Sequence, residues 1–501
     1  MSSMSSKETP RVQINRISNS EYSFKLSNKV GIRFVCKALT FTDPNIYAYN
    51  RKIEKFDKRK LTFKRGMLND VEEYLNERQV DYSVTDYDFD LPDGVEIDDR
   101  MTGKYIHQRK AVENFYKKRF GIIQVPTRGG KTFIMSEILR IFLDNFKGNF
   151  LFCVDSTDLF TQAVGDIHTF FERYGGVEVG EIRSGKIDLS KRVTVAMMQT
   201  LQSVFSAKNK DRKKRIEVEK YLKNIAFLSV DEIHDNFSKS RFKIYKRCHR
   251  IEFLLLLSAT PYKGGEVVQN LRLKEWSGDV IYKITEKSLR KRKVLSDYKV
   301  FELVVDHNDI DYDIDSEDYS ELREKLIFNS DFRNGVLIKT IGIMQKLGVK
   351  TLVLFQSIDH GSIVSQLTDL PFISGRDKNK IREQRKKEFL EADGGVLLAS
   401  HIFKKGIPLP AAEVLINVDD GVQDANTIQK KGRVLGVTET KERSAIIDFI
   451  DLYDAYFSEH SDSRLDVYVD AIGEDNIGIL DTSSDDWAET LERWIKKWLK
   501  V

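Results

Sequence analysis

The stretch Val125–Thr132, with the sequence VPTRGGKT, decides how this chain is interpreted. It begins where the apolar run GIIQV ends, and the helical run FIMSEILRIFL follows it, which is the strand, loop and helix order of a phosphate-binding loop. Backbone N–H groups at the start of such a helix favour phosphate oxygens. The sequence therefore predicts a nucleoside triphosphate site, with Lys131 on the β- and γ-phosphates and the Thr132 hydroxyl on Mg²⁺. The residues expected around the phosphates are Thr127, Gly129, Gly130, Lys131 and Thr132.

Short apolar runs alternate with helical stretches around this loop and again further along the chain. Continuous apolar strands between helices predict a buried, mostly parallel sheet. The alternation stops near residue 285 and returns after residue 335, so we expect an α/β protein with two parallel-sheet domains in tandem. The runs are GIIQV (121–125), NFLFCV (149–154), VTVAM (193–197), IAFLSV (225–230) and FLLLLSA (253–259), and then TLVLFQ (351–356), GVLLAS (395–400), EVLINV (413–418) and AIIDFI (445–450).

Other segments give the remaining domain boundaries. Residues 1–95 are interpreted as a small basic α/β accessory domain, with strand-like runs at 22–42, and the segment 51–65 carries eight Lys or Arg against two acidic residues. The two sheet domains span residues 100–285 and 336–460.

Residues 286–335 are so highly charged that we expect a connector rather than core. In the C-terminal extension, 461–501, four apolar side chains share one helical face, which predicts an amphipathic helix docked on the second sheet domain. These side chains are Trp487, Leu491, Trp494 and Trp498.

The composition excludes several classes of protein. Of 501 residues, 41% are hydrophobic and 32% are charged, which is enough apolar material for several cores and excludes a mainly disordered chain. No run approaches the roughly 18 apolar residues of a membrane span, and no secretory signal is visible. The three cysteines have no paired metal-binding spacing, so we expect a cytoplasmic location, which is the host cytoplasm if the protein is phage-encoded.

Two adjacent carboxylates follow the apolar strand IAFLSV. Asp231 and Glu232 stand where this strand ends, and ligands bind at the carboxyl edge of a parallel sheet. A site that hydrolyses a nucleotide needs one carboxylate near Mg²⁺ and one to orient the attacking water. We assign the first role to Asp231 and the second to Glu232. His234 is interpreted either as a link to a second site or as a hydrogen-bonded structural residue.

These motifs together resemble those of superfamily 2 helicases and translocases of the DExH type. VPTRGGKT, DEIH (231–234) and LSATP (257–261) look like motifs I, II and III of the family. The resemblance implies two RecA-like domains that hold ATP between them, with Ser258, Thr260 and His234 coupling the ATP site to a nucleic-acid strand. Upstream, YIHQ (105–108) is similar to the adenine-reading element, with Gln108 as the base contact.

Other segments resemble the motifs with which the family contacts nucleic acid and nucleotide. CVDSTDLFTQ (153–162) and AMMQTL (196–201) place Ser156, Thr157, Gln199 and Thr200 near a strand, and VLFQSIDHG (353–361) does the same for Gln356 and Ser357. SHIFKKGIPLP (400–410) is similar to motif V, with His401 near nucleic acid and Gly406 near ATP. NTIQKKGRVLG (426–436) resembles motif VI, with Gln429 and Arg433 in catalytic positions.

One position departs from the family pattern. Motif VI usually ends in a second arginine, and this chain has Gly436 there. We therefore assign the arginine finger to Arg433, a role worth ~10³–10⁵ in rate in other nucleotide hydrolases, with Lys430, Lys431 or Arg443 as candidate helpers. The departure also keeps open a binding protein with a degenerate ATP site.

The basic segment 51–65 is a candidate nucleic-acid contact, because clustered Lys and Arg release counterions from a phosphate backbone. Its aromatic side chains, Phe56 and Phe63, could stack on exposed bases. Such a module before the motor resembles phage recombination helicases that remodel branched DNA. The cationic residues assigned to this contact are Lys58, Arg59, Lys60, Lys64 and Arg65.

The expected function is therefore that of an ATP- and Mg²⁺-dependent DNA helicase or translocase that works on branched DNA, for example in branch migration. Single- and double-strand junctions in DNA are the expected partner, and the sequence does not indicate a protein partner. Three alternatives stay open, namely a DExH RNA helicase, a translocase on duplex DNA that does not unwind it, and the degenerate binding protein.

Overall fold

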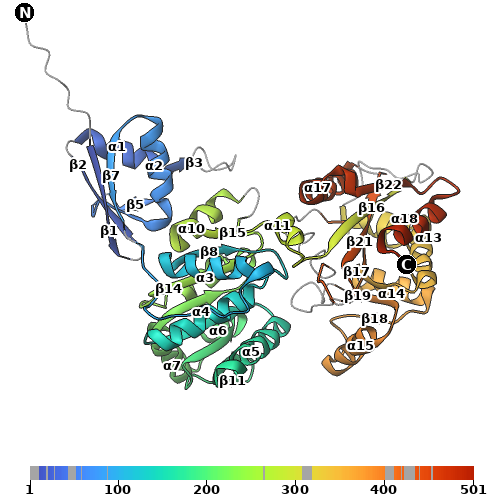
Figure 1. Cartoon of the computed structure of the whole chain (residues 1–501), viewed down its shortest axis with the longest axis horizontal. Helices are drawn as coiled ribbons and strands as arrows, with labels where there is room; N and C mark the ends of the chain where they lie inside the picture. The colour runs from blue at the N-terminus through green and yellow to red at the C-terminus, as the bar shows by residue number, and fades with distance from the viewer. Residues whose placement is uncertain are drawn as a thin grey trace, which may run out of the picture. The chain divides into compact units, whose positions relative to one another are not determined.

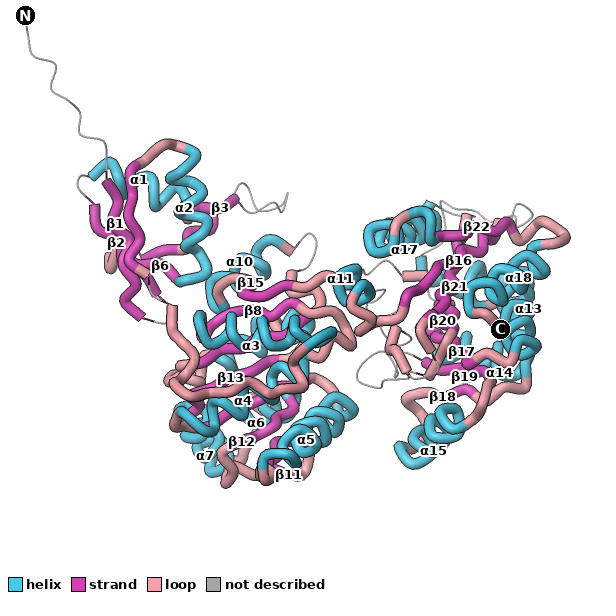
Figure 2. Tube along the Cα trace, in the orientation of Figure 1, coloured by secondary structure: helices cyan, strands magenta, loops and turns pink. Residues whose placement is uncertain are grey.

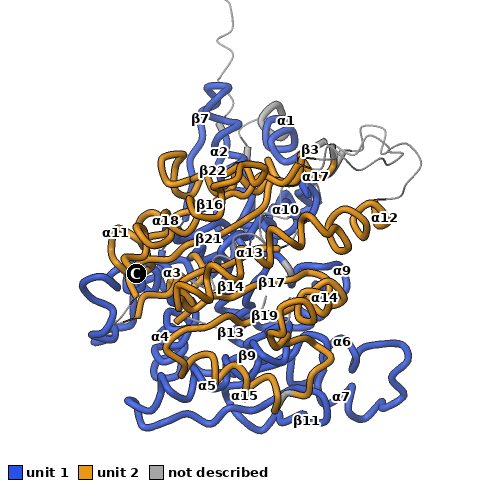
Figure 3. Tube along the Cα trace, turned by 90° about the vertical axis from the view of Figure 1, so that its right-hand side faces the viewer, with its two compact units in different colours: residues 1–125, 130–284 blue, residues 126–129, 285–501 orange. Residues whose placement is uncertain are grey.

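The computed structural model of the chain is described over most of its length (Figures 1 and 2). The described residues are 11–18, 21–26, 29–42, 52–57, 59–86, 88–262, 266–306, 319–400, 411–418, 420–421, 435–438, 441–452 and 455–501. They divide into two compact units (Figure 3). The first unit contains residues 1–125 and 130–284, and the second contains residues 285–501 together with 126–129.

The first unit begins with a small module around a five-stranded sheet, in the order β5-β6-β2-β1-β7. Strand β1 pairs antiparallel with β2 and parallel with β7, and a short antiparallel pair, β3 and β4, lies outside this sheet. The elements are β1 (Arg11–Ser18), β2 (Glu21–Leu26), α1 (Lys29–Ala38), β3 (Thr40–Thr42), β4 (Lys52–Glu54), β5 (Phe56–Asp57), β6 (Thr62–Lys64), α2 (Leu68–Glu77) and β7 (Asp81–Thr85).

The strand-like interpretation of residues 31–39 is wrong, because these residues belong to α1 and the turn after it. Their β-branched and aromatic residues favour a strand locally. In the folded module, Val35 and Leu39 are fully buried one helical turn apart, within the core that also contains Val12 and Phe24. Packing of this helical face overrides the local preference.

The module is docked on the rest of the first unit through the segment that follows β6. Arg65 Nη1 donates to the carbonyl of Lys118 over 2.8 Å, and Lys274 Nζ lies 2.7 Å from Asp70 Oδ2. A Cβ atom at Gly66 would lie 1.7 Å from the carbonyl oxygen of Lys274, so only glycine allows this approach. The module and the first sheet domain therefore pack directly on each other.

The first sheet domain has eight strands in the order β11-β10-β12-β9-β13-β14-β8-β15. All neighbours are parallel except β10 and β11, as the apolar runs predicted. Its strands are β8 (Phe120–Gln124), β9 (Asn149–Val154), β10 (Val179–Arg183), β11 (Lys186–Ile187), β12 (Val193–Met197), β13 (Ile225–Val230), β14 (Phe253–Ser258) and β15 (Val280–Lys283). Its helices are α3 (Ile106–Lys118), α4 (Lys131–Asn145), α5 (Thr157–Phe171), α6 (Met198–Val204), α7 (Arg212–Lys223), α8 (Ile233–Asn236), α9 (Lys239–Tyr245) and α10 (Val267–Ser277).

The second unit is built on a seven-stranded, all-parallel sheet in the order β18-β19-β17-β20-β21-β16-β22. Its strands are β16 (Asp297–Val305), β17 (Lys350–Phe355), β18 (Phe372–Ile373), β19 (Gly395–Ser400), β20 (Val414–Asn417), β21 (Arg443–Asp451) and β22 (Ile477–Asp481). Its helices are α11 (Glu286–Lys291), α12 (Tyr319–Arg323), α13 (Asp331–Leu347), α14 (Ile358–Thr368), α15 (Asn379–Glu391), α17 (Ala455–Ile472) and α18 (Trp487–Leu499).

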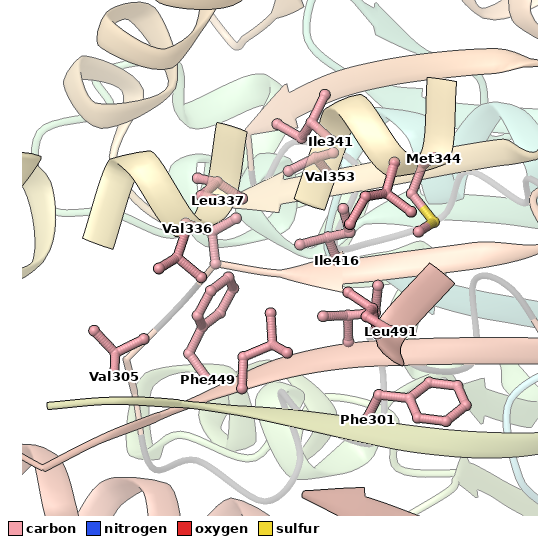
Figure 4. Packing of buried hydrophobic residues seen from close by; sticks show 14 of the residues in the cluster. Phe301, Val305, Val336, Leu337, Ile341, Met344, Val353, Ile416, Phe449 and Leu491 are labelled. Carbon is pink, nitrogen blue, oxygen red and sulfur yellow. The ribbon is translucent and has the colours of Figure 1, made fainter. Parts of the chain in front are cut away.

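The interpretation of residues 286–335 as a connector outside the core is wrong for β16. This strand pairs with β21 and β22, and Val300, Leu303 and Val305 are fully buried. Figure 4 shows Val305 among the core residues of the second unit. Highly charged segments flank it on both sides, and they dominate the composition of the window from which the connector was inferred.

The C-terminal helix α18 docks on the second sheet, as its spacing predicted. Trp487, Leu491 and Ile495 are buried in the same core as Phe301, and Trp494 and Trp498 pack against that core. Figure 4 shows Leu491 and Phe301 in this core. The preceding strand β22, which the sequence analysis did not predict, adds an edge to the sheet. Among the described helices, none is long and apolar enough to cross a membrane.

Candidate functional site

The predicted phosphate loop joins the carboxyl end of β8 to the start of α4. Val125 N donates to the carbonyl of Ser258 over 3.1 Å, which fixes the entry of the loop beside β14. Arg128 and Gly130 have left-handed φ values of 65° and 91°. A Cβ atom at Gly130 would lie 2.1 Å from Gln108 Nε2, so this glycine is required where α3 meets the loop. The structure therefore brings the predicted adenine contact, Gln108, against the phosphate loop.

The two predicted carboxylates lie beside the loop lysine. Lys131 Nζ is 3.0 Å from Glu232 Oε1, although 101 residues separate them in the sequence. Glu232 has φ 43° and ψ 57°, a left-handed conformation that is rare for a non-glycine residue, and its N–H donates to Asp231 Oδ1 over 2.9 Å. Backbone strain of this kind concentrates at functional sites. The strand end thus holds both carboxylates next to the phosphate loop.

The electrostatics of this edge suit a divalent cation. Burial raises the pKa of Asp231 to about 6, and the charge of Glu232 adds to the rise while Lys131 opposes it. Two adjacent carboxylates with one lysine leave a surplus of negative charge, which a cation would neutralise. Asp231 and the half-buried Thr132 at the start of α4 offer the oxygen ligands that Mg²⁺ prefers.

Two buried polar atoms at the site have no hydrogen-bond partner among the residues that the structure describes. They are Thr127 Oγ1 in the loop and Glu232 Oε2, which faces the ring of His234 at 3.4 Å. Buried polar groups are normally paired, so each such atom needs an explanation. A phosphate oxygen could accept from Thr127, and a water could donate to Glu232. The residues present therefore fit a nucleotide with its metal ion.

His234 connects the carboxylate segment to the end of β14. Its Nδ1 lies 2.8 Å from Ser258 Oγ, and the Thr260 N–H donates to the same hydroxyl oxygen over 3.1 Å. His234 and Ser258 are both buried. The histidine is therefore hydrogen-bonded inside the protein, and its ring lies between the DEIH and LSATP segments. Its role in coupling stays a prediction.

Four residues of the first sheet domain that were predicted to lie near nucleic acid are gathered beside Asp155, namely Ser156, Thr157, Gln199 and Thr200. Ser156 caps α5 by accepting from Leu159 N over 3.2 Å, and Thr157 begins that helix. Gln199, at the start of α6 beside Thr200, donates from Nε2 to the Asp155 carbonyl over 3.5 Å. These side chains come from different segments, and the parallel sheet brings their strand ends to one edge.

An arginine that the sequence analysis did not select completes this cluster. Arg241 of α9 forms an ion pair with Asp155 and donates from Nη1 to Asn236 Oδ1 over 2.7 Å. A signal was present in the sequence, because residues 236–251 contain six Lys or Arg and no acidic residue.

In the second unit, only some of the residues predicted to contact ATP or nucleic acid lie within the described residues. Gln356 Oε1 accepts from Arg323 Nη2 over 2.5 Å, and Ser357 caps α14. Gly436 pairs with Leu295 in an antiparallel bridge. Five predicted residues lie outside the described residues, namely Lys58, His401, Gly406, Gln429 and Arg433.

The basic segment 51–65 is only partly available for nucleic acid. Arg65 is engaged with Lys118, and Lys64 Nζ lies 3.0 Å from Glu21 Oε1. Arg59 and Lys60 are exposed on a turn whose N–H groups donate to Asp57.

Base stacking by Phe63 is ruled out in this structure. This side chain is 2% exposed and stacks on Tyr22 with ring centroids 5.7 Å apart, and Phe56 packs partly buried against the same core. The alternation of side chains along β6 turns Phe63 toward the core of the module.

The fold and the site together define a class of protein: the chain resembles superfamily 2 helicases and translocases, with tandem RecA-like sheets and a phosphate loop beside a DExH segment. Residues 103–263 match the family model described as type III restriction enzyme, res subunit.

Curated relatives agree with this class. The chain is 21% identical over 360 residues to the ATP-dependent DNA helicase uvsW of Enterobacteria phage T4, a match that covers 69% of this chain and 68% of that protein. It is 23% identical over 419 residues to the DNA 3'-5' translocase XPB2 of Sulfurisphaera tokodaii, covering 75% and 87%.

Among solved structures, Saccharomyces cerevisiae Dbp5 bound to RNA and ADP BeF3 is similar, with a TM-score of 0.53 and 16% identity over 78% of this chain and 93% of that one. The predicted fold of tandem RecA-like domains is confirmed. The family model and the curated relatives agree with the predicted class of ATP-dependent helicases and translocases.

Proposed function

We propose that this protein is an ATP- and Mg²⁺-dependent DNA helicase that remodels branched DNA. The observation that carries the proposal is the ion pair between Lys131 and Glu232 beside a phosphate loop with a buried, unpaired Thr127 hydroxyl. The substrate class is supported by the relative from phage T4, whose name describes an ATP-dependent DNA helicase.

The loop residues bind and orient the triphosphate. The backbone from Arg128 to Gly130 and the Lys131 ammonium neutralise phosphate charge at the start of α4. Thr132 and Asp231 are the proposed Mg²⁺ ligands, and the ion when bound would neutralise charge that develops between the β- and γ-phosphates. Gln108, against Gly130, is the proposed adenine contact.

The ion pair implies that phosphate binding precedes orientation of the attacking water. While Lys131 Nζ holds Glu232 Oε1, the carboxylate is oriented toward the lysine rather than toward a water molecule. Phosphate oxygens compete for the lysine, and their arrival frees Glu232 to accept a hydrogen bond from the attacking water. Hydrolysis then depends on the phosphates binding first, because Lys131 must leave Glu232 before this carboxylate can orient the water.

Coupling to the strand runs through His234. The ring contacts Ser258, whose hydroxyl also accepts from the Thr260 backbone, so a shift of Glu232 is transmitted to the end of β14. In the second unit, Arg433 is the proposed arginine finger, and Gln429, Gly406 and His401 keep the nucleotide and strand roles that the resemblance implies.

The test is ATP hydrolysis measured with single-stranded DNA, duplex DNA, a four-way junction and RNA, using Lys131→Ala as the inactive control. We expect stimulation by DNA, with the junction most effective. Stimulation by RNA alone would reverse the substrate assignment, and no hydrolysis with any of them would favour a degenerate binding protein.

Translocation on duplex DNA without unwinding is a second candidate, because the archaeal relative is named a DNA 3'-5' translocase. Displacement of a triplex-forming strand from intact duplex separates the two functions. Triplex displacement without any strand separation on a forked substrate would favour the translocase.

A further inference from the structure

A strongly basic surface on the first unit lies outside the residues assigned above. The exposed residues that define it, here called the α7–α9 surface, are Arg212, Lys213 and Arg215 in the first turn of α7 and Lys239, Lys243 and Lys246 on α9. The whole chain has a net charge of only +4, so this concentration of positive charge is local.

The charge on α9 lies on one side of the helix. Lys239, Lys243 and Lys246 follow at spacings of four and three residues, which places them on one helical face, and all three are exposed. Within the described part of the chain, none of the three forms an ion pair, whereas Arg241 and Arg247 on the same segment pair with Asp155 and Glu219. The arginines thus hold the segment in place, and the lysines are left exposed without an acidic partner in the described ranges, with Lys246 Nζ 4.8 Å from the ring centroid of Phe242.

Contacts join α7 and α9 into one surface. Arg247, just after α9, pairs with Glu219 of α7 and lies 4.1 Å from the ring centroid of Phe205, while Arg215 lies 5.9 Å from the same ring. Between them, α6 contacts both helices, and Gln202 Nε2 donates to Ser240 Oγ over 2.9 Å.

The same surface continues to the cluster around Asp155. Arg241, two residues after Lys239, binds Asp155, which also accepts from Gln199 and precedes Ser156. Lysines on α9 therefore begin beside the side chains proposed to meet the nucleic-acid strand and extend away from them along α9.

We propose that the α7–α9 surface binds the phosphate backbone of DNA beyond the strand held at Ser156 and Gln199. A solvated surface of a soluble protein usually mixes both signs of charge. Here residues 236–251 carry no acid, and residues 207–215 carry six basic residues with one acidic residue, Asp211, which is used to cap α7. The inference rests on the proposed function only in taking DNA as the partner.

The expected effect is a change in the salt dependence of binding. Each contact between a cation and a duplex phosphate contributes about 0.9 to the slope of log K against log salt concentration. Removing three contacting lysines should therefore reduce the slope by roughly two to three. A variant that only loosened the fold would change affinity without this graded change in slope.

The experiment uses the full chain without nucleotide, so that it does not depend on ATP hydrolysis. The variant Lys239→Gln/Lys243→Gln/Lys246→Gln is compared with Lys110→Gln/Lys117→Gln/Lys147→Gln, which removes three exposed lysines elsewhere on the first unit. Binding to a duplex and to a four-way junction is titrated between low and moderate salt, with an RNA duplex of the same sequence as a further arm.

We expect the α9 variant to lose tenfold or more in DNA affinity at moderate salt, with the reduced slope, while the control variant changes little. Equal behaviour of the two variants would overturn the proposal, and so would a reduced slope on RNA alone. If the natural protein bound DNA but did not hydrolyse ATP, the proposed function would be contradicted. The comparison of DNA binding by the two variants would still stand.

Discussion

Lys131 Nζ lies 3.0 Å from Glu232 Oε1, so the cation of the phosphate loop is held by the carboxylate proposed to orient the attacking water. Both side chains are largely buried, which strengthens the interaction relative to an ion pair in water. In the proposed mechanism the phosphates compete with Glu232 for Lys131, so mutation of Glu232 should distinguish nucleotide binding from hydrolysis.

Glu232→Gln should abolish turnover while it preserves nucleotide binding. The amide cannot act as a base, a role worth ~10²–10⁴ in rate, and its neutral charge releases Lys131 to the phosphates. ATP hydrolysis and the Kd of a fluorescent nucleotide measure the two effects. Glu172→Gln, on an exposed residue, serves as the control. Unchanged kcat, or loss of nucleotide binding, would show that the assignment is wrong.

His234→Ala should separate ATP hydrolysis from strand stimulation. Removing the ring leaves the buried Ser258 hydroxyl without its 2.8 Å partner, which costs about 1–3 kcal/mol of stability. We expect basal hydrolysis to persist and DNA stimulation to fall several-fold, and His234→Gln to restore part of it. Hydrolysis is measured with and without DNA, after the melting temperature confirms folding. Full stimulation in His234→Ala would remove the coupling role.

Arg433→Ala should abolish DNA-stimulated hydrolysis, by ~10³-fold or more if this residue is the arginine finger. Gly436→Arg is the variant to compare with it, since it restores the arginine that the family pattern has at this position. A higher rate in Gly436→Arg would show that the natural residue limits turnover. Unchanged turnover in Arg433→Ala would place the finger elsewhere.

Gly66→Ala should loosen the N-terminal module from the first sheet domain. The new Cβ would overlap the carbonyl oxygen of Lys274, and such overpacking costs about 1–3 kcal/mol. Hydrogen exchange in α10 reports the change. Gly165→Ala, where the new Cβ meets nothing within 4 Å, is the matched control. Equal protection of α10 in the two variants would contradict this docking contact.

His360 should make the second unit sensitive to acid. Burial, followed by the charges of Arg333 and Arg323, lowers the pKa of His360 to about 3, and its Nε2 lies 2.8 Å from Asn334 Oδ1. The unfolded chain binds a proton near pH 6.5, whereas the folded chain does not until about pH 3. Stability that is present above pH 6.5 is therefore lost as the pH falls toward 3, by up to about 1.4 kcal/mol per pH unit.

His360→Gln retains a donor for Asn334 without titrating, so its unfolding free energy should fall less between pH 7 and pH 5 than that of the natural protein. Denaturant unfolding at a series of pH values measures the difference. Parallel curves for the two proteins would show that His360 does not contribute to acid sensitivity.

The sequence by itself determined the parallel sheets and most of the first-unit site. Asp231 and Glu232 directly follow the buried strand β13, and Lys131 follows β8 through the phosphate loop. Parallel strands present their carboxyl ends at one edge, so local spacing was enough to predict that these residues meet. Gln108 was assigned only through the resemblance of YIHQ to the adenine-reading element, and the structure places it against Gly130.

Only the tertiary structure decided which local patterns were buried. It placed β16 inside the second sheet despite its charged neighbours, turned residues 31–38 into a helix, directed Phe63 into the core and joined Arg241 to Asp155. The physical reason is that periodicity records which side of an element is apolar. Which surface covers that side, and which distant charge a cation meets, depends on packing between segments that are far apart in the sequence.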